Sequence, residues 1–184
     1  MSSSEGAGAK AAKNGMGDLE SMISESASSE LVCLKLAKIL NVRRSEVALL
    51  RVEKGSLRFV FPVELRSAGV LPLSGSAVAA RTAATRTPLL SNSFMRVKHV
   101  SLFEAVRLSG SGEESTMEEQ MPIQKIMSVP VAADDKVTGV VQVSRKGLDV
   151  KLAGADFTGE DLKQLERAAE ILARMPFMQE GAEL

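Results

Sequence analysis

Two segments rich in β-branched residues, 126–131 and 137–144, lie close together in this 184-residue chain. The short linker between them contains Asp134 and Asp135, and aspartate tolerates the backbone conformations of tight turns. The pattern predicts an antiparallel β-hairpin. Because this is the clearest strand signal in the sequence, an antiparallel sheet is the element around which the fold must be built.

A second pair of strands is predicted nearer the N-terminus, over 46–52 and 56–61, with a turn at 53–55. In the later strand, large apolar residues occupy every other position, which is the period of a strand with one buried face. Pro62 follows at once and limits the pairing there, because proline has no N–H to donate.

Helices are predicted at both ends of this strand-rich region. The stretch 19–40 contains no glycine or proline and follows Asp18, a good N-cap, and its apolar residues fall on two sides of a helical wheel. Thr158 and Asp161 have the spacing of a capping box, which predicts a last helix over 159–175. A helix with two apolar sides has two partners, and we expect one of them to be a second subunit.

The order is helix, two strands, a small alanine-rich helix near 77–84, an irregular region, the hairpin and a last helix. Strands that neighbour in sequence, with helices collected at the ends, predict an α+β domain in which an antiparallel sheet carries the terminal helices on one face. The central helices and loops are then expected to cover the other face, with a ligand pocket beneath them.

Residues 1–17 have the composition of a disordered tail, so we predict a domain over 18–176 and a C-terminal tail over 177–184. No apolar run is long enough for a signal peptide or a membrane span, and a single cysteine needs no oxidising compartment. The sequence therefore predicts a cytoplasmic protein with no membrane contact.

The composition also argues against several kinds of site. One Cys and one His cannot supply the three or four ligands of a zinc site, and the zero net charge is unlike that of a nucleic-acid-binding protein. No spacing places a carboxylate, His or Lys beside a catalytic partner. We therefore expect no metal, no cofactor, no nucleic acid and no enzymatic activity.

Several short motifs occur in the order seen in one family of signalling modules. Over roughly 19–175 the chain resembles a GAF domain, a small-molecule-binding and dimerisation module. The motifs are Leu73-Ser74-Gly75-Ser76, Ala79-Ala80-Arg81-Thr82 with Pro88-Leu89, Ile126-Met127-Ser128-Val129-Pro130-Val131, Gly139-Val140-Val141-Gln142-Val143-Ser144, and Phe157-Thr158 with Asp161-Leu162.

The resemblance implies an antiparallel sheet of five or six strands with helices on one side and a pocket on the other. GAF domains bind cyclic nucleotides, tetrapyrroles, amino acids, oxo-acids or haem, and some bind nothing. The cyclic-nucleotide motif is only partly present here, since Arg145 and Leu162 replace its Asn and Glu. The resemblance still implies that Lys146 and Asp161 clasp the sheet to the last helix.

Two further family functions are disfavoured by the cysteine content. Methionine-sulfoxide reductases of this fold need more than one thiol, and bilin-binding members attach their chromophore through a Cys near the pocket. The only cysteine of this chain, Cys33, lies in the first predicted helix. We interpret it as a small buried hydrophobe, with a redox-sensing role as the alternative.

Candidate ligand-binding residues are polar or aromatic side chains near the expected pocket. Ser74 and Ser76 open the small helix and either cap it or, with Arg81, form an anion site. Gln142, a polar residue within a β-branched strand, points either to solvent or into the pocket. The other candidates are Phe94, Phe103, Gln124 and His99, and His99 is also interpreted as a surface residue.

These features together predict a non-enzymatic regulatory or sensory domain. It binds a small polar or anionic ligand and signals as a homodimer, through helices 19–40 and 159–175, or through a partner protein. The alternative is a dimerisation or interaction scaffold whose pocket is closed by side chains.

Overall fold

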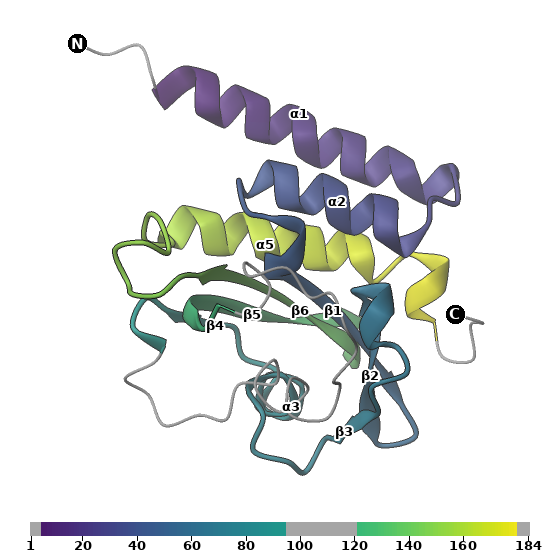
Figure 1. The fold of residues 1–184 in the computed structure, drawn as a ribbon. Coiled ribbons are helices and arrows are strands. Elements are labelled where there is room, and N and C mark those ends of the chain that lie inside the picture. Colours follow the sequence, from purple (N-terminus) through teal and green to yellow (C-terminus); the bar gives the residue numbers. More distant parts are fainter. Residues whose placement is uncertain (1–4, 95–120, 180–184) are drawn as a thin grey trace.

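In the computed structural model, the described residues are 5–94 and 121–179, with side chains described from residue 14 onward. Their strands form one six-stranded antiparallel sheet, as predicted, and the strand order is β3-β2-β1-β6-β5-β4 (Figure 1). The strands are β1 (Val47–Glu53), β2 (Ser56–Phe61), β3 (Val70–Pro72), β4 (Leu89–Ser91), β5 (Ile123–Ala133) and β6 (Lys136–Lys146).

Both predicted hairpins are present. In the β5–β6 hairpin Ala133 pairs with Lys136, and the intervening Asp134 and Asp135 have φ angles of 47° and 64°. Two central residues with positive φ match the twist of the flanking strands, which explains why acidic turn residues mark this hairpin. The strands extend beyond the predicted limits, with buried residues 123–125 at the start of β5 and with exposed residues that continue the pairing toward the turn.

The helices lie on both faces of the sheet. Helices α2 (Ser29–Ile39) and α5 (Gly159–Leu172) cover one face, and α3 (Val78–Thr85) lies on the other (Figure 1). Three short 3-10 turns complete the described elements: η1 (Arg44–Glu46), η2 (Val63–Leu65) and η4 (Pro176–Met178).

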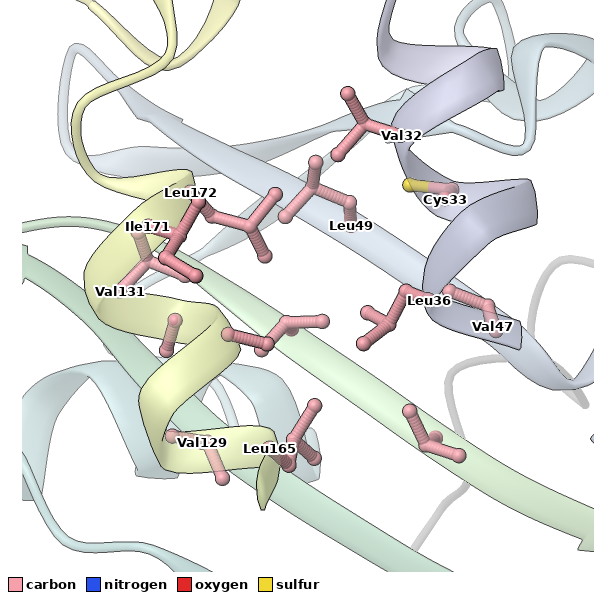
Figure 2. Packing of buried hydrophobic residues seen from close by; sticks show 14 of the residues in the cluster. Val32, Cys33, Leu36, Val47, Leu49, Val129, Val131, Leu165, Ile171 and Leu172 are labelled. Carbon is pink, nitrogen blue, oxygen red and sulfur yellow. The ribbon is translucent and has the colours of Figure 1, made fainter. Parts of the chain in front are cut away.

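Side chains of β1 alternate between two cores, one on each face of the sheet. Val47 and Leu49 point to the helical layer, where α2 and α5 contribute Leu36 and Leu172 (Figure 2). The intervening Ala48 and Leu50 belong to the cluster beneath α3. The sheet is therefore a central layer with helices above and below, as expected for the predicted α+β class.

The prediction of one helix over 19–40 is wrong, because the chain bends between two helices. Helix α1 (Glu5–Ser24) ends before Ser26, whose φ angle is 51°, and the Ser28 hydroxyl caps α2 by accepting from the Leu31 amide at 3.3 Å. Serine competes with the helix for backbone hydrogen bonds, so this serine-rich stretch favours a break.

Helix α1 begins inside the segment 1–17, for which the composition predicts disorder. Met16 and Leu19 are buried in the same core as α2 and α5, and α1 forms a further layer over these helices (Figure 1). A Cβ atom at Gly15 would lie 2.8 Å from Cγ1 of Ile39 on α2. Glycine thus allows the two helices to approach closely, and this packing supports a helix that local composition does not favour.

The chain beyond α5 turns back onto the sheet. Met178 of η4 is fully buried, and Nη1 of Arg51 donates to the Phe177 carbonyl at 2.9 Å. Gly139 on β6 leaves the space that Met178 fills, because a Cβ there would collide with the Met178 methyl group. The predicted domain limit at residue 176 therefore falls inside a packed element.

No helix in the described part of the chain is both long and apolar enough to cross a membrane.

Candidate functional site

The face of the sheet opposite α2 and α5 carries α3, and this helix has two functionally different sides. Ala79, Ala80 and Ala83 pack directly on the sheet beside Val140. Alanines let the helix axis approach the strands closely, so side chains fill the space directly beneath α3. The other side of the helix holds the residues that line a hollow.

This hollow has a volume of about 250 Å³ and lies among α3, the turn that follows it and the start of β4. It is smaller than the roughly 300–1,000 Å³ of typical drug-sized pockets, so it suits a small molecule. Four lining residues have the i, i+3, i+4, i+7 spacing of one helical stripe. The lining residues are Val78, Arg81, Thr82, Thr85, Thr87, Pro88 and Leu89.

A chain of buried hydrogen bonds runs from the hollow to the centre of the sheet. The Thr82 hydroxyl donates to the Val78 carbonyl at 2.8 Å and lies 2.7 Å from the Ser128 hydroxyl on β5. Nε2 of Gln142 on β6 donates to the same Ser128 oxygen at 3.2 Å. Of the two orientations predicted for Gln142, the structure shows the one toward α3, with the residue 2% exposed.

Arg81 also lines the hollow, and it is the one cation among the described lining residues. Phe94 is buried in a small cluster with Val78, next to the hollow. Three of the predicted candidates, Arg81, Phe94 and Gln142, are thus brought together around α3. His99 and Phe103 lie outside the described residues.

Ser74 and Ser76 do not cap α3, so that prediction is wrong. The N-cap residue is Ala77, whose side chain makes no capping bond, and both serines are exposed. The Gly75 amide instead donates to the Pro72 carbonyl at 2.9 Å. Ser74 lies within this tight turn and Ser76 lies between the turn and the N-cap Ala77, so both serines precede the helix.

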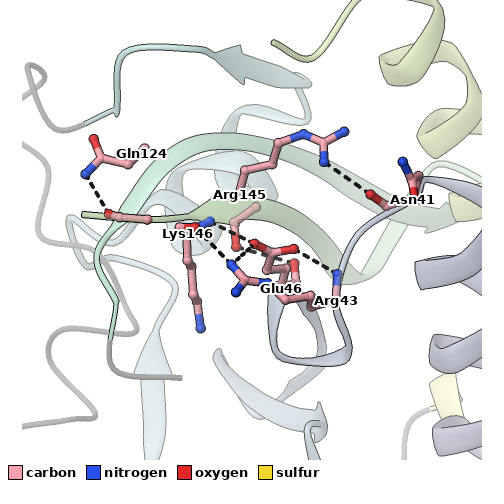
Figure 3. Close-up of polar contacts among 8 residues, drawn as sticks. Asn41, Arg43, Glu46, Gln124, Arg145 and Lys146 are labelled. Atoms are coloured by element: carbon pink, nitrogen blue, oxygen red, sulfur yellow. Dashed lines mark hydrogen bonds and ion pairs between the residues drawn. The ribbon is translucent and has the colours of Figure 1, made fainter. Parts of the chain in front are cut away.

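Gln124 is buried, but its side chain makes a hydrogen bond to the main chain and does not line the hollow. Its Nε2 donates to the Gly147 carbonyl at 3.0 Å, and it is absent from the described lining of the hollow (Figure 3). The amide therefore joins the start of β5 to the end of β6.

Sequence reasoning missed a buried carboxylate near the end of β6. Glu46 is 4% exposed, and its side chain accepts from the Arg43 amide at 2.8 Å, from Nη2 of Arg43 at 2.7 Å and from the Lys146 amide at 2.9 Å (Figure 3). Three donors around one carboxylate indicate a structural role, which is to hold η1 against β6. An isolated Glu beside arginines gives no sequence signal for this.

The clasp expected between Lys146 and Asp161 is replaced by other contacts. Asp161 accepts from the Thr158 amide at 2.8 Å in the predicted capping box. The guanidinium of Arg145 lies 4.8 Å from the centre of the Phe157 ring and donates to the Asn41 carbonyl at 3.1 Å. The residue that replaces the family's Asn thus links β6 to the start of α5.

Cys33 is fully buried in the helical core. Burial raises the pKa of its thiol well above the ordinary value, because the core does not solvate a thiolate. Within the described residues, no group of three His, Cys, Asp or Glu side chains is close enough to hold a metal ion.

Comparisons with known proteins agree with this architecture. The family model of the GAF domain matches residues 26–175. A GAF domain of a Coxiella burnetii phosphoenolpyruvate-protein phosphotransferase is similar, with a TM-score of 0.66 at 11% identity, covering 89% of this chain and 91% of that one. The corresponding Acinetobacter domain has a TM-score of 0.62 at 15% identity, covering 87% and 89%. No curated protein matches the sequence.

The prediction that the chain is not an enzyme is wrong as an inference from this fold. A type II free methionine-R-sulfoxide reductase from Thermoplasma acidophilum has a TM-score of 0.54 at 14% identity, covering 85% of this chain and 94% of that one. Since an enzyme shares the architecture, the fold does not exclude catalysis.

Proposed function

The chain belongs to the GAF domain family, and on this premise we propose that it is a regulatory or sensory domain that binds a small polar or anionic ligand in the hollow beside α3. The observation that carries the proposal is the lining of this hollow. Arg81 supplies a positive charge, threonine hydroxyls supply hydrogen bonds, and Val78 and Leu89 supply apolar surface. A few polar groups on an apolar background are typical of small-molecule sites.

A ligand at this position has a route to the rest of the domain. Thr82 lines the hollow and is linked through Ser128 to Gln142 on β6. The opposite face of β6 supports the helical core through Val141 and Val143. A shift of α3 on ligand binding therefore acts on strands that also carry α2 and α5.

We place the output of the domain at its helical layer, through a homodimer or a partner protein. The predicted dimer surface comprised residues 19–40 and 159–175, and α1 now occupies part of the outer face of that layer (Figure 1). Leu31 on α2 remains 56% exposed, so apolar surface is still available for association. Sedimentation of the full chain at high micromolar concentration tests the homodimer, and a monomer there contradicts it.

A ligand-free interaction scaffold is the second candidate function. The direct contact of Ala79, Ala80 and Ala83 with the sheet favours it, because this part of the interior is already filled. Native mass spectrometry of freshly purified full-length chain separates the two. A co-purified small molecule, lost in a variant with Thr82→Leu to fill the hollow, supports ligand binding. A chain that carries no small molecule and is not stabilised by any compound in a broad metabolite screen supports the scaffold.

A further inference from the structure

Three large aliphatic side chains are exposed within five residues of one loop. Leu148 and Leu152 are 73% and 68% exposed, with Val150 between them, and in the described part of the chain only Leu31 and Val70 are comparable. The loop connects β6 to α5 and lies at one end of the layered domain (Figure 1). A solvated connection has no structural need for such a group of side chains, so the loop indicates a contact surface.

The loop is closed on itself. The Ala153 amide donates to the Asp149 carbonyl at 3.1 Å, which makes one helical turn, and the Asp149 carboxylate accepts from the Leu152 amide at 2.8 Å. Gly147 lets the two ends of the loop touch, because a Cβ atom there would lie 2.7 Å from the Ala153 nitrogen. The exposed side chains therefore stand on an ordered turn.

Two buried polar side chains of β5 hold this turn at both ends. Nε2 of Gln124 donates to the Gly147 carbonyl at 3.0 Å, and Nζ of Lys125 donates to the Gly154 carbonyl at 2.5 Å (Figure 3 shows the first bond). Lys125 is buried and also pairs with Asp156 at 2.8 Å. A surface whose backbone is fixed in advance loses little conformational entropy when a partner covers it.

Opposite charges lie on the two sides of Leu152. Successive side chains of a helical turn point about 100° apart, so Asp149 and Lys151 project on opposite sides of this leucine. Both charged residues are exposed, and neither forms an ion pair with another described residue. A two-fold axis that sets one such turn against another brings Lys151 of one copy opposite Asp149 of the partner subunit. The surface is thus complementary to itself.

From this arrangement we propose that the β6–α5 loop is an interface at which two copies of the chain associate about a two-fold axis. Leu148 and Leu152 form its centre, and the pairs between Lys151 and Asp149 of the partner subunit form its rim. A partner of one sign, such as an anionic membrane, would attract one of these charges and repel the other. The surface is separate from the hollow and from the helices, so this inference goes beyond the proposed function.

The size of the surface sets the strength of the contact. A stable interface buries about 800 Å² on each partner, and a loop of five residues offers less than this. Association through the loop is therefore weak and depends on concentration. If the helical layer also forms a dimer, the loop contact joins such dimers into a larger assembly.

Sedimentation equilibrium of the full chain, from low to high micromolar concentration, tests the interface. We expect the wild-type mass to rise with concentration, and the double variant Leu148→Ser, Leu152→Ser to raise the dissociation constant about tenfold or more. Leu31→Ser is the matched control, since this leucine on α2 is also exposed. A wild type that stays monomeric overturns the inference, and so does a double variant that associates like the wild type.

Charge variants test the two-fold geometry. Lys151→Glu places a carboxylate opposite Asp149 of the partner subunit, so the dissociation constant should rise about fivefold or more. Adding Asp149→Asn should recover part of this loss, because it removes the repulsion and keeps the side-chain oxygen that accepts from Leu152. Lys54→Glu, in the β1–β2 turn, is the control for net charge. No recovery on adding Asp149→Asn overturns the two-fold arrangement.

The outcomes separate this interface from the association proposed for the helical layer. If Leu31→Ser weakens association and the loop variants do not, the helical dimer stands and the inference fails. If the loop variants alone weaken it, the loop interface stands and the helical dimer fails. If both weaken it and the loop variants leave a smaller assembly, both contacts stand.

Discussion

The hydroxyl oxygens of Thr82 on α3 and Ser128 on β5 lie 2.7 Å apart in a contact that is otherwise built largely from alanine and larger apolar side chains. Both residues are buried, with exposures of 3% and 0%. A buried hydroxyl pair of this kind fixes the position of a helix more specifically than apolar packing, because hydrogen bonds are directional. It therefore decides how α3 sits on the sheet.

Replacing one partner of this pair should destabilise the protein. The Thr82 proton is donated to the Val78 carbonyl, so the Ser128 hydroxyl donates to Thr82. Thr82→Val keeps the shape of the side chain but removes this acceptor, so we expect a loss of about 1–3 kcal/mol in the free energy of unfolding. Urea denaturation measures it. Adding Ser128→Ala removes the unsatisfied hydroxyl but also takes the acceptor from Nε2 of the buried Gln142, so the double variant should lose less than the sum of the two single variants without returning to the stability of the wild type. A double variant as unstable as the sum of the single variants argues against coupling.

Gly139 on β6 should not tolerate a side chain. A Cβ atom there would meet the Leu50 carbonyl oxygen and the Met178 methyl group, so Gly139→Ala must displace backbone or η4. We expect a loss of about 1–3 kcal/mol, typical of overpacking. Gly17→Ala is the control, because a Cβ there has no neighbour within 4 Å and alanine favours helix α1. Equal free energies of unfolding for the two variants would contradict the packing of Met178 against Gly139.

Glu53 should make stability depend on acid pH. The hydrogen bond from Arg51, together with Arg58, lowers the pKa of the Glu53 carboxyl below its ordinary value. The unfolded chain therefore binds a proton more readily, and stability from this group is full above about pH 4.3 and is lost as pH falls through the folded-state pKa. Chemical denaturation at a series of pH values gives the free energy of unfolding of the wild type and of Glu53→Gln. The difference between these two free energies should shrink as the pH falls. A constant difference between them would contradict the prediction.

Cys33 should be unreactive in the folded protein. Its burial removes access, and its raised pKa removes the thiolate that attacks disulfide reagents. At about pH 8, near the ordinary pKa of a thiol, we expect a chromogenic disulfide reagent to label the unfolded chain quickly and the native chain only as it opens. Rapid labelling of the native protein would show that this part of α2 is open to solvent.

The hairpins and the last helix were predictable because their signals are local. The turn residues Asp134 and Asp135 adopt positive φ through their own chemistry, and Thr158 and Asp161 complete a capping box within one helical turn. The alternation of β2 predicted the common face of Leu57 and Phe59, but Phe61 packs with Val60 in the core on the other side of the sheet. These features need no distant partner, so a reader of the sequence can find them.

The site was only partly predictable. Arg81, Phe94 and Gln142 were proposed from the sequence and meet around α3, but Ser74 and Ser76 do not reach the cap position. The place of Thr85 and Thr87 in the lining of the hollow was missed, because a threonine near the end of a helix carries no distinctive pattern. Only the position of β4 against the end of α3 makes these residues part of a hollow.

The amino-acid sequence alone was enough to specify the class of fold and the family, because periodicity, turn chemistry and short motifs are read over a few residues. The packing of Gly15 on α1 against Ile39 on α2, the burial of Glu46 and the contact of Met178 with Gly139 depended on tertiary structure. Each involves groups far apart in the chain, such as Glu46 with Lys146 or Met178 with Gly139. Burial and hydrogen bonding between such groups exist only once the layers have packed, and no local pattern encodes them.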